Sequence, residues 1–130
     1  MSAISTLQLE MNPHAILSLF HIFAVVPFFL YVALSRANTH PQVYQALFGL
    51  GIVLIIYQSY KAFTRYFTNS SYLWVNLIHV AIIGPVLIYI GYKQKETPRP
   101  AYEILALISF AALGYHMYSL VLQANVVDEN

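Results

Sequence analysis

The sequence predicts an all-α membrane protein, an antiparallel four-helix transmembrane bundle made of two tandem helical-hairpin repeats. The chain is 59% hydrophobic and only 8% charged, whereas a soluble domain carries about 25% charged residues. Four long apolar stretches contain no Lys, Arg, Asp or Glu. The second half of the chain also repeats the first half at an offset of 58 residues.

The repeat defines the building unit of the chain, because self-similarity at a fixed period marks a repeated structural element. Aligning Leu19-Phe20-His21 with Leu77-Ile78-His79 needs no gap and superposes further identical pairs. They include Pro27 and Pro85, Tyr31 and Tyr89, Thr39 and Thr97, Tyr44 and Tyr102, Tyr57 and Tyr115, and Tyr60 and Tyr118. We therefore expect hairpin repeats at 14–67 and 72–125, with an N-terminal tail at 1–13 and a C-terminal tail at 126–130.

Each repeat contains two stretches long enough to span a bilayer, which takes about 20 helical residues. Asn12-Pro13 is a cap followed by a first-turn proline, and Ser70-Ser71 provides a cap for the third helix. The short links between stretches favour antiparallel neighbours. The four predicted spans are 14–35, 42–60, 72–92 and 104–126.

The cations predict the orientation, because Lys and Arg are enriched on the cytoplasmic side. Links 36–41 and 93–100 lie on one side of the bundle and carry four cations, and the opposite side carries two. The first group is Arg36, Lys93, Lys95 and Arg99, and the second is Lys61 and Arg65. Both termini are therefore expected on the non-cytoplasmic side. Because each hairpin crosses twice, the repeats are related by a pseudo-two-fold axis along the membrane normal.

Several classes of function are excluded by composition. The absence of cysteine excludes disulfides, thiolate metal sites and cysteine nucleophiles. A formal net charge of +1 leaves no basic stripe for nucleic acid. No nucleophile with an oriented base is evident, which speaks against an ordinary enzyme. The expected partners are the lipid bilayer and further copies of the chain in a homo-oligomer.

A layer of polar residues is predicted in the outer half of the bundle. His21 and His79 each lie about seven residues, or roughly 10 Å, inside the outer boundary. His116 on the descending fourth span reaches a similar depth, and Gln58 is its counterpart on the second span. Three imidazoles and one amide are therefore expected to share one layer.

Further polar residues flank this layer at helical spacing. Four of them lie three residues from a layer residue, which places them on the same helix face. They are Ser18, Asn76, Lys61 and Ser119. Tyr57 and Tyr115 precede Gln58 and His116, and either hydrogen bonding to a layer histidine or simple packing explains them. Isolated polar groups facing lipid are costly, so these faces are expected to line a pocket.

Pro27 and Pro85 follow the layer histidines by six residues. Each removes a helical hydrogen bond and frees a carbonyl near Phe23 or Ala81. A tolerated kink is one interpretation, since proline is frequent in membrane helices. A cavity widened by the kink is the other.

The first functional hypothesis is the passage of protons or small ions through this layer. Ionisable residues inside a membrane mark functional sites, and histidine titrates near neutral pH, with an ordinary pKa of about 6.5. No predicted span contains a carboxylate that would serve a proton-coupled carrier. A channel-like pathway is therefore favoured, inside one bundle or on the axis of an oligomer.

Three alternatives remain open. Two histidines facing each other across the pseudo-two-fold axis form a natural axial pair for haem b, and Gly51, Gly84 and Gly114 leave room for the macrocycle. His21, His79 and His116 form a three-histidine site for zinc or copper. The last alternative is a non-catalytic membrane scaffold, in which the histidines only hydrogen-bond between helices.

Overall fold

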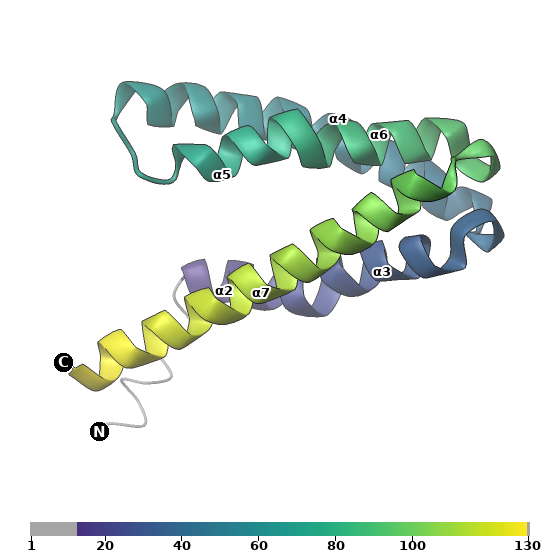
Figure 1. The fold of residues 1–130 in the computed structure, drawn as a ribbon. Coiled ribbons are helices and arrows are strands. Elements are labelled where there is room, and N and C mark those ends of the chain that lie inside the picture. The colour runs from purple at the N-terminus through teal and green to yellow at the C-terminus, as the bar shows by residue number, and fades with distance from the viewer. Residues whose placement is uncertain (1–12, 130) are drawn as a thin grey trace. The chain divides into compact units, whose positions relative to one another are not determined.

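The structure, a computed structural model, describes the backbone of residues 13–129 and the side chains of residues 13–122 (Figure 1). The described residues form helices and short connections, with no strand among them. Four helical segments are long and apolar enough to cross a membrane: Pro13–Asn38, Pro41–Phe67, Leu73–Glu96 and Arg99–Leu122. The prediction of an all-α chain with four such helices is confirmed. Residues 1–12 of the predicted N-terminal tail lie outside the described residues.

The first two helical segments follow the predicted order. The first comprises α2 (Pro13–Phe20), the π-helical turn η1 (His21–Val25) and α3 (Val26–Ser35), followed by the 3₁₀ turn η2 (Arg36–Asn38). The second is α4 (Pro41–Phe67). Proline in its first turn and a hydrogen bond from the Gln42 backbone N–H to His40 Nδ1 begin α4. Because α4 continues beyond the predicted span 42–60, Lys61 and Arg65 lie on this helix.

The last two segments repeat this order of elements. The third comprises α5 (Leu73–Ile78), the π-helical turn η3 (His79–Ile83) and α6 (Gly84–Lys93), followed by the 3₁₀ turn η4 (Gln94–Glu96). The fourth is α7 (Arg99–Glu129). It includes most of the residues predicted as the C-terminal tail.

The chain divides into two compact units. The terminal unit contains the residues up to Tyr31 and those from Ala106 onward, and the central unit is Val32–Leu105. In the central unit α4 packs along α5 and α6 (Figure 1).

Glycines allow α4 and α6 to approach closely. A Cβ added at Gly91 would lie 2.6 Å from the backbone nitrogen of Phe48 and 2.7 Å from its Cα. A Cβ at Gly51 would lie 2.8 Å from Ile88 Cγ1 and 3.1 Å from the carbonyl oxygen of Gly84. Real Cβ atoms do not tolerate the shorter of these contacts, so small residues set the distance between the helices. Small residues have the same role in helix pairs of known membrane proteins.

Two residues with left-handed backbone end the first and third helical segments. Arg36 has φ 51° and Gln94 has φ 52°, a conformation that most non-glycine residues avoid. Their carbonyl oxygens turn away from the helices and accept hydrogen bonds from the backbone N–H groups of Thr39 and Thr97 at 3.0 and 3.1 Å.

Two buried tyrosines provide the second donor for each of these carbonyls. The Tyr44 hydroxyl lies 2.6 Å from the Arg36 carbonyl oxygen, and the Tyr102 hydroxyl lies 3.1 Å from that of Gln94. The two hydroxyl oxygens are 2.7 Å apart, and the tyrosine side chains are 0% and 2% exposed. Because two hydrogens serve three contacts, one contact lacks a hydrogen at any moment.

Other local features also occur at positions 58 residues apart. The π-helical turns η1 and η3 and the 3₁₀ turns η2 and η4 have this offset. Thr39 and Thr97 are both buried. They differ in one respect: the Thr97 hydroxyl donates to the Ile90 carbonyl at 3.3 Å, whereas Thr39 Oγ1 has no hydrogen-bond partner among the described residues.

Replacing Tyr44 with phenylalanine tests the role of the buried hydroxyl. The variant leaves the Arg36 carbonyl with one donor and removes the hydrogen bond between the two tyrosine hydroxyls, so the Tyr102 hydroxyl keeps only its contact with the Gln94 carbonyl. We expect a loss of about 1–3 kcal/mol of stability. Thermal unfolding in detergent measures it. Tyr31→Phe is the control, since Tyr31 is 44% exposed, and equal unfolding midpoints for both variants would contradict the assignment.

Alanine substitution of two glycines tests the close helix contact. Gly91→Ala forces the α4 and α6 backbones apart and is expected to cost about 1–3 kcal/mol through overpacking. Gly49→Ala is the matched control on α4, because a Cβ there meets no atom within 4 Å. In unfolding by heat or denaturant, the Gly91→Ala variant should be clearly less stable than the Gly49→Ala variant. The reverse order of stability would contradict the close contact between α4 and α6.

Candidate functional site

The predicted site residues fall into two clusters, one in each unit. Ser18, His21 and His116 lie together in the terminal unit. Gln58 and Asn76 lie together in the central unit, joined by Arg65.

A π-helical turn begins at each of His21 and His79. The Val26 N–H donates to the His21 carbonyl and the Gly84 N–H donates to the His79 carbonyl, which are i to i+5 bonds. Pro27 and Pro85 follow directly, and their missing N–H groups rule out the ordinary bonds to Phe23 and Ala81. The widened turn is the local response to each proline, and such turns are frequent at functional sites.

In the terminal unit two histidine rings stack on each other. The ring centroids of His21 and His116 are 4.3 Å apart with an interplanar angle of 22°. His116 Nδ1 lies 3.2 Å from Ser18 Oγ, and Ser18 is 3% exposed. Two imidazoles and a hydroxyl, from α2, η1 and α7, thus form one continuous polar cluster on otherwise apolar helices.

Two of the histidines have a defined tautomer. His21 Nδ1 lies 2.8 Å from the carbonyl oxygen of Leu17, and His79 Nδ1 lies 2.7 Å from that of Val75. A carbonyl oxygen only accepts, so each Nδ1 carries the hydrogen and donates. In the neutral ring Nε2 is then the acceptor, which binds a proton or a metal ion. Metal-ligating histidines in proteins are oriented by the same kind of bond.

In the central unit a chain of three polar side chains connects α4 with α5. Arg65 Nη1 donates to Asn76 Oδ1 at 2.8 Å, and Asn76 Nδ2 donates to Gln58 Oε1 at 2.5 Å. Asn76 is 3% exposed, so both ends of its amide are satisfied inside the protein. Arg65 was not among the residues predicted for the polar layer. Its spacing of seven from Gln58, two helical turns, is the signal that was available.

The other predicted residues surround these clusters. Lys61 Nζ lies 6.0 Å from the ring centroid of Tyr57 on the same helix, within the range of a cation–π contact. The ring edge of Tyr115 contacts His116, with centroids 5.1 Å apart. Ser119 lies half-buried on α7, one turn after His116.

The space predicted for a haem macrocycle is partly filled by side chains. Ile88 packs against Gly51, and Ile55 packs against Gly84. At Gly114 a Cβ would meet no atom within 4 Å. Among the described side chains, no three His, Asp or Glu residues gather into a group that would hold a metal ion.

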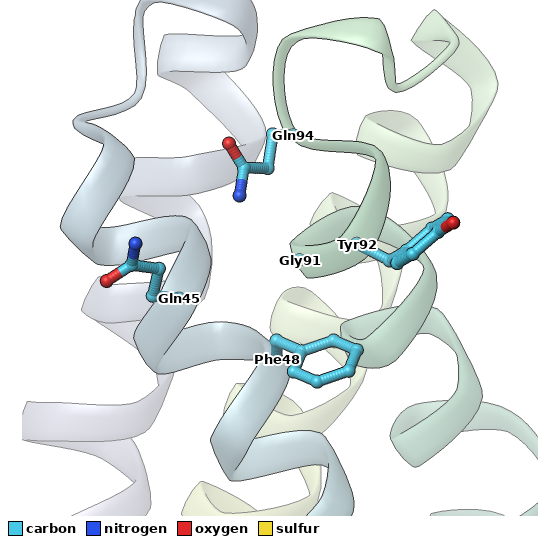
Figure 2. A pocket seen from close by; sticks show the side chains of 5 residues that line it. All are labelled: Gln45, Phe48, Gly91, Tyr92 and Gln94. Carbon is cyan, nitrogen blue, oxygen red and sulfur yellow. The ribbon is translucent and has the colours of Figure 1, made fainter.

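A pocket of about 370 Å³ lies in the central unit between α4 and the segment formed by the end of α6 and η4 (Figure 2). Figure 2 shows Gln45 and Gln94 on neighbouring segments, with the ring of Tyr92 extending away from both. Phe48 and Gly91 complete the lining. None of the residues predicted for the functional site lines this pocket.

The fold and its polar clusters define a small all-α protein with four helices long and apolar enough to cross a membrane. A scan against protein-family models, a search of curated proteins and a search of solved structures each found no match to this chain.

The tautomers of the histidines are testable by ¹⁵N NMR in detergent micelles. His21 and His79 in their neutral forms should carry the hydrogen on Nδ1, because that nitrogen donates to a carbonyl. His40 is the internal control with the opposite tautomer, since its Nδ1 accepts from the Gln42 N–H. Nitrogen shifts that give His21 or His79 the same tautomer as His40 would contradict the geometry.

Proposed function

We propose that the chain spans the membrane four times as two tandem helical hairpins related by a pseudo-two-fold axis along the membrane normal. The recurrence of π-helical turns, 3₁₀ turns and buried tyrosines at the same offset supports the duplication. Large apolar side chains exposed on the helices, such as Phe23, Leu34 and Leu107, support contact with lipid.

The proposed orientation has both termini on the non-cytoplasmic side. The hydrogen bond between Tyr44 and Tyr102 joins the starts of α4 and α7, so the two links that precede these helices lie at the same end. The four cations of the two links therefore lie at the same end of the helices, which supports a cytoplasmic location for both links.

Within this framework, we infer that the protein passes protons or small ions by way of its histidines. The observation that carries the proposal is the stacked pair of His21 and His116 beside the buried hydroxyl of Ser18. Titratable side chains are costly inside a membrane and are retained there chiefly for function. The proposed pathway also includes His79 and Gln58, on the basis of their depth along the predicted spans.

The histidines have different roles in this proposal. His21 and His79 each hold a hydrogen on Nδ1 through a bond to a carbonyl, so they gain and lose a proton at Nε2 and act as charge switches. His116 Nδ1 instead faces a hydroxyl, which both accepts and donates. In the proposed relay, the Ser18 hydroxyl accepts the hydrogen of protonated His116 Nδ1 and donates its own hydrogen to a water molecule, so that Ser18 ends neutral and the proton moves on.

Electrostatic repulsion couples the switch to the pathway. Two unit charges about 4 Å apart repel by roughly 4 kcal/mol at an effective dielectric constant of about 20. In this proposal the rings of His21 and His116, 4.3 Å apart, repel each other and move apart when both are charged. When the two rings move apart, water enters the space between the helices. A lower pH should therefore open the pathway.

Flux of protons into proteoliposomes tests the proposal. The flux should rise as the pH falls from about 7 to about 6, the range in which histidine side chains gain charge. His116→Ala and His79→Ala should reduce it to the level of protein-free vesicles or remove its pH dependence, and Ser18→Ala should slow it.

His40→Ala is the matched control for these variants, because His40 is an exposed residue that caps α4. It should leave the flux unchanged. Equal flux from wild type, all variants and protein-free vesicles would refute the proposal.

A second candidate function is the binding of haem b by axial histidines. The Nδ1 bonds of His21 and His79 to carbonyls favour it, because they direct Nε2 outward as a ligand. An absorption spectrum with metal analysis of the purified protein tests this candidate. A Soret band that His79→Ala removes, together with the absence of flux, would favour haem binding over ion passage.

A further inference from the structure

We propose that Arg65 and Lys61 form a binding site for a phosphate-type oxyanion where α4 meets α5. The site lies within the central unit and does not depend on ion passage through the histidines. Its elements are a guanidinium held in place by neutral partners, a second cation one turn away and a surrounding group of exposed aromatic residues.

Arg65 is positioned by the protein. An arginine near the end of a membrane helix usually extends along its own helix toward water. Here the half-buried guanidinium instead crosses to α5 and donates to Asn76, whose other amide group is bound to Gln58. The ring of Tyr72 lies 5.8 Å from the guanidinium carbon on the same side of the hairpin. These contacts restrict the rotamers of Arg65 before any ligand binds.

The charge of Arg65 is not neutralised by these contacts. Asn76 is uncharged, and its bond to Nη1 uses one of the five guanidinium N–H donors. The ion pair among the described side chains joins Arg99 and Glu103, and no described carboxylate lies within 4 Å of Arg65 or Lys61. A fixed guanidinium with unused donors matches the oxygens of a phosphate group, which it binds in a bidentate manner.

Lys61 adds a second charge on the same face of α4. It precedes Arg65 by four residues, a spacing at which like charges repel each other and destabilise a helix. An anion bound between the two side chains converts this repulsion into attraction. The contact of Lys61 with the Tyr57 ring keeps the ammonium on this part of the helix.

Exposed aromatic residues indicate the depth of this site. Tyr and Trp concentrate at the headgroup level of a membrane. Four large aromatic side chains close to the turn between α4 and α5 are exposed: Tyr66, Phe67, Tyr72 and Trp74. Arg65 therefore lies where phospholipid phosphates are found. Inorganic phosphate from the aqueous phase has the same chemistry, so the test separates the two sources.

The full-length protein in detergent is titrated with phosphatidylglycerol and, separately, with inorganic phosphate, and bound ligand is counted by native mass spectrometry. Arg65→Gln should weaken binding about tenfold, as expected for loss of a charge-assisted hydrogen bond. Arg36→Gln is the charge-matched control, an exposed cation that precedes α4, and should change binding less than about twofold. Binding of the lipid alone identifies a headgroup site, and competition by inorganic phosphate identifies a general oxyanion site.

Asn76→Ser separates positioning from charge, because it leaves every charge in place and shortens the side chain that holds Arg65. It should weaken binding several-fold, as should Arg65→Lys, which keeps the charge and loses the planar fork. If the Arg65→Gln variant does not fold, the binding measured for Asn76→Ser and Arg65→Lys tests the proposal. Equal losses for Arg65→Gln and Arg36→Gln, or wild-type binding by both Asn76→Ser and Arg65→Lys, would overturn the proposal. Proton flux measured on the same variants reports on the histidine pathway separately.

Discussion

The hydrogen bond between the hydroxyls of Tyr44 and Tyr102 is the contact on which the central unit depends. The first and third helical segments end at left-handed residues, and each ending leaves a carbonyl turned away from its helix. In an apolar environment an unsatisfied carbonyl costs several kcal/mol. The tyrosines provide donors at both carbonyls, and they also join α4 to α7 at their first turns. The same two side chains therefore stabilise the ends of the first and third helical segments and hold the first turns of α4 and α7 together.

The helices and their lengths could be predicted from the sequence, because charge-free stretches of about 20 residues have few alternatives to a helix that crosses a membrane. The helix ends were harder to predict. Arg36 and Gln94 adopt a conformation usually reserved for glycine, and neither residue signals it. Their carbonyls are satisfied by side chains eight residues later, a contact that depends on the folded arrangement.

In the candidate site, counting residues along each predicted span placed His21, Gln58, His79 and His116 in one layer. The structure places His21 beside His116 and Ser18, and Gln58 beside Asn76. The direction in which a side chain points around its helix does not come from counting. Arg65 was assigned to the membrane boundary for this reason, whereas its guanidinium turns to Asn76 on the neighbouring helix. The prolines were expected to free a carbonyl, and the structure adds a feature that was not predicted, a π-helical turn that begins at the preceding histidine.

The hydrogen bonds described for the two polar clusters have uncharged partners. Ser18 contacts His116, and Asn76, itself bound to Gln58, accepts from Arg65. An ion pair would fix the charge state of its members, whereas a neutral partner leaves the net charge of the cluster free to change with a proton or a bound anion. The composition of the spans, with histidines and amides but no acids, has this physical consequence.

The tyrosine pair has one further property, which concerns how the two links communicate. Each hydroxyl contacts a link carbonyl and the other hydroxyl, so the two hydrogens can both lie on the carbonyls, or one of them can lie between the two hydroxyl oxygens. A new donor at one link carbonyl therefore leaves its tyrosine hydrogen available to the other hydroxyl. The two turns are in this way connected by hydrogen bonds, although 58 residues of chain separate them.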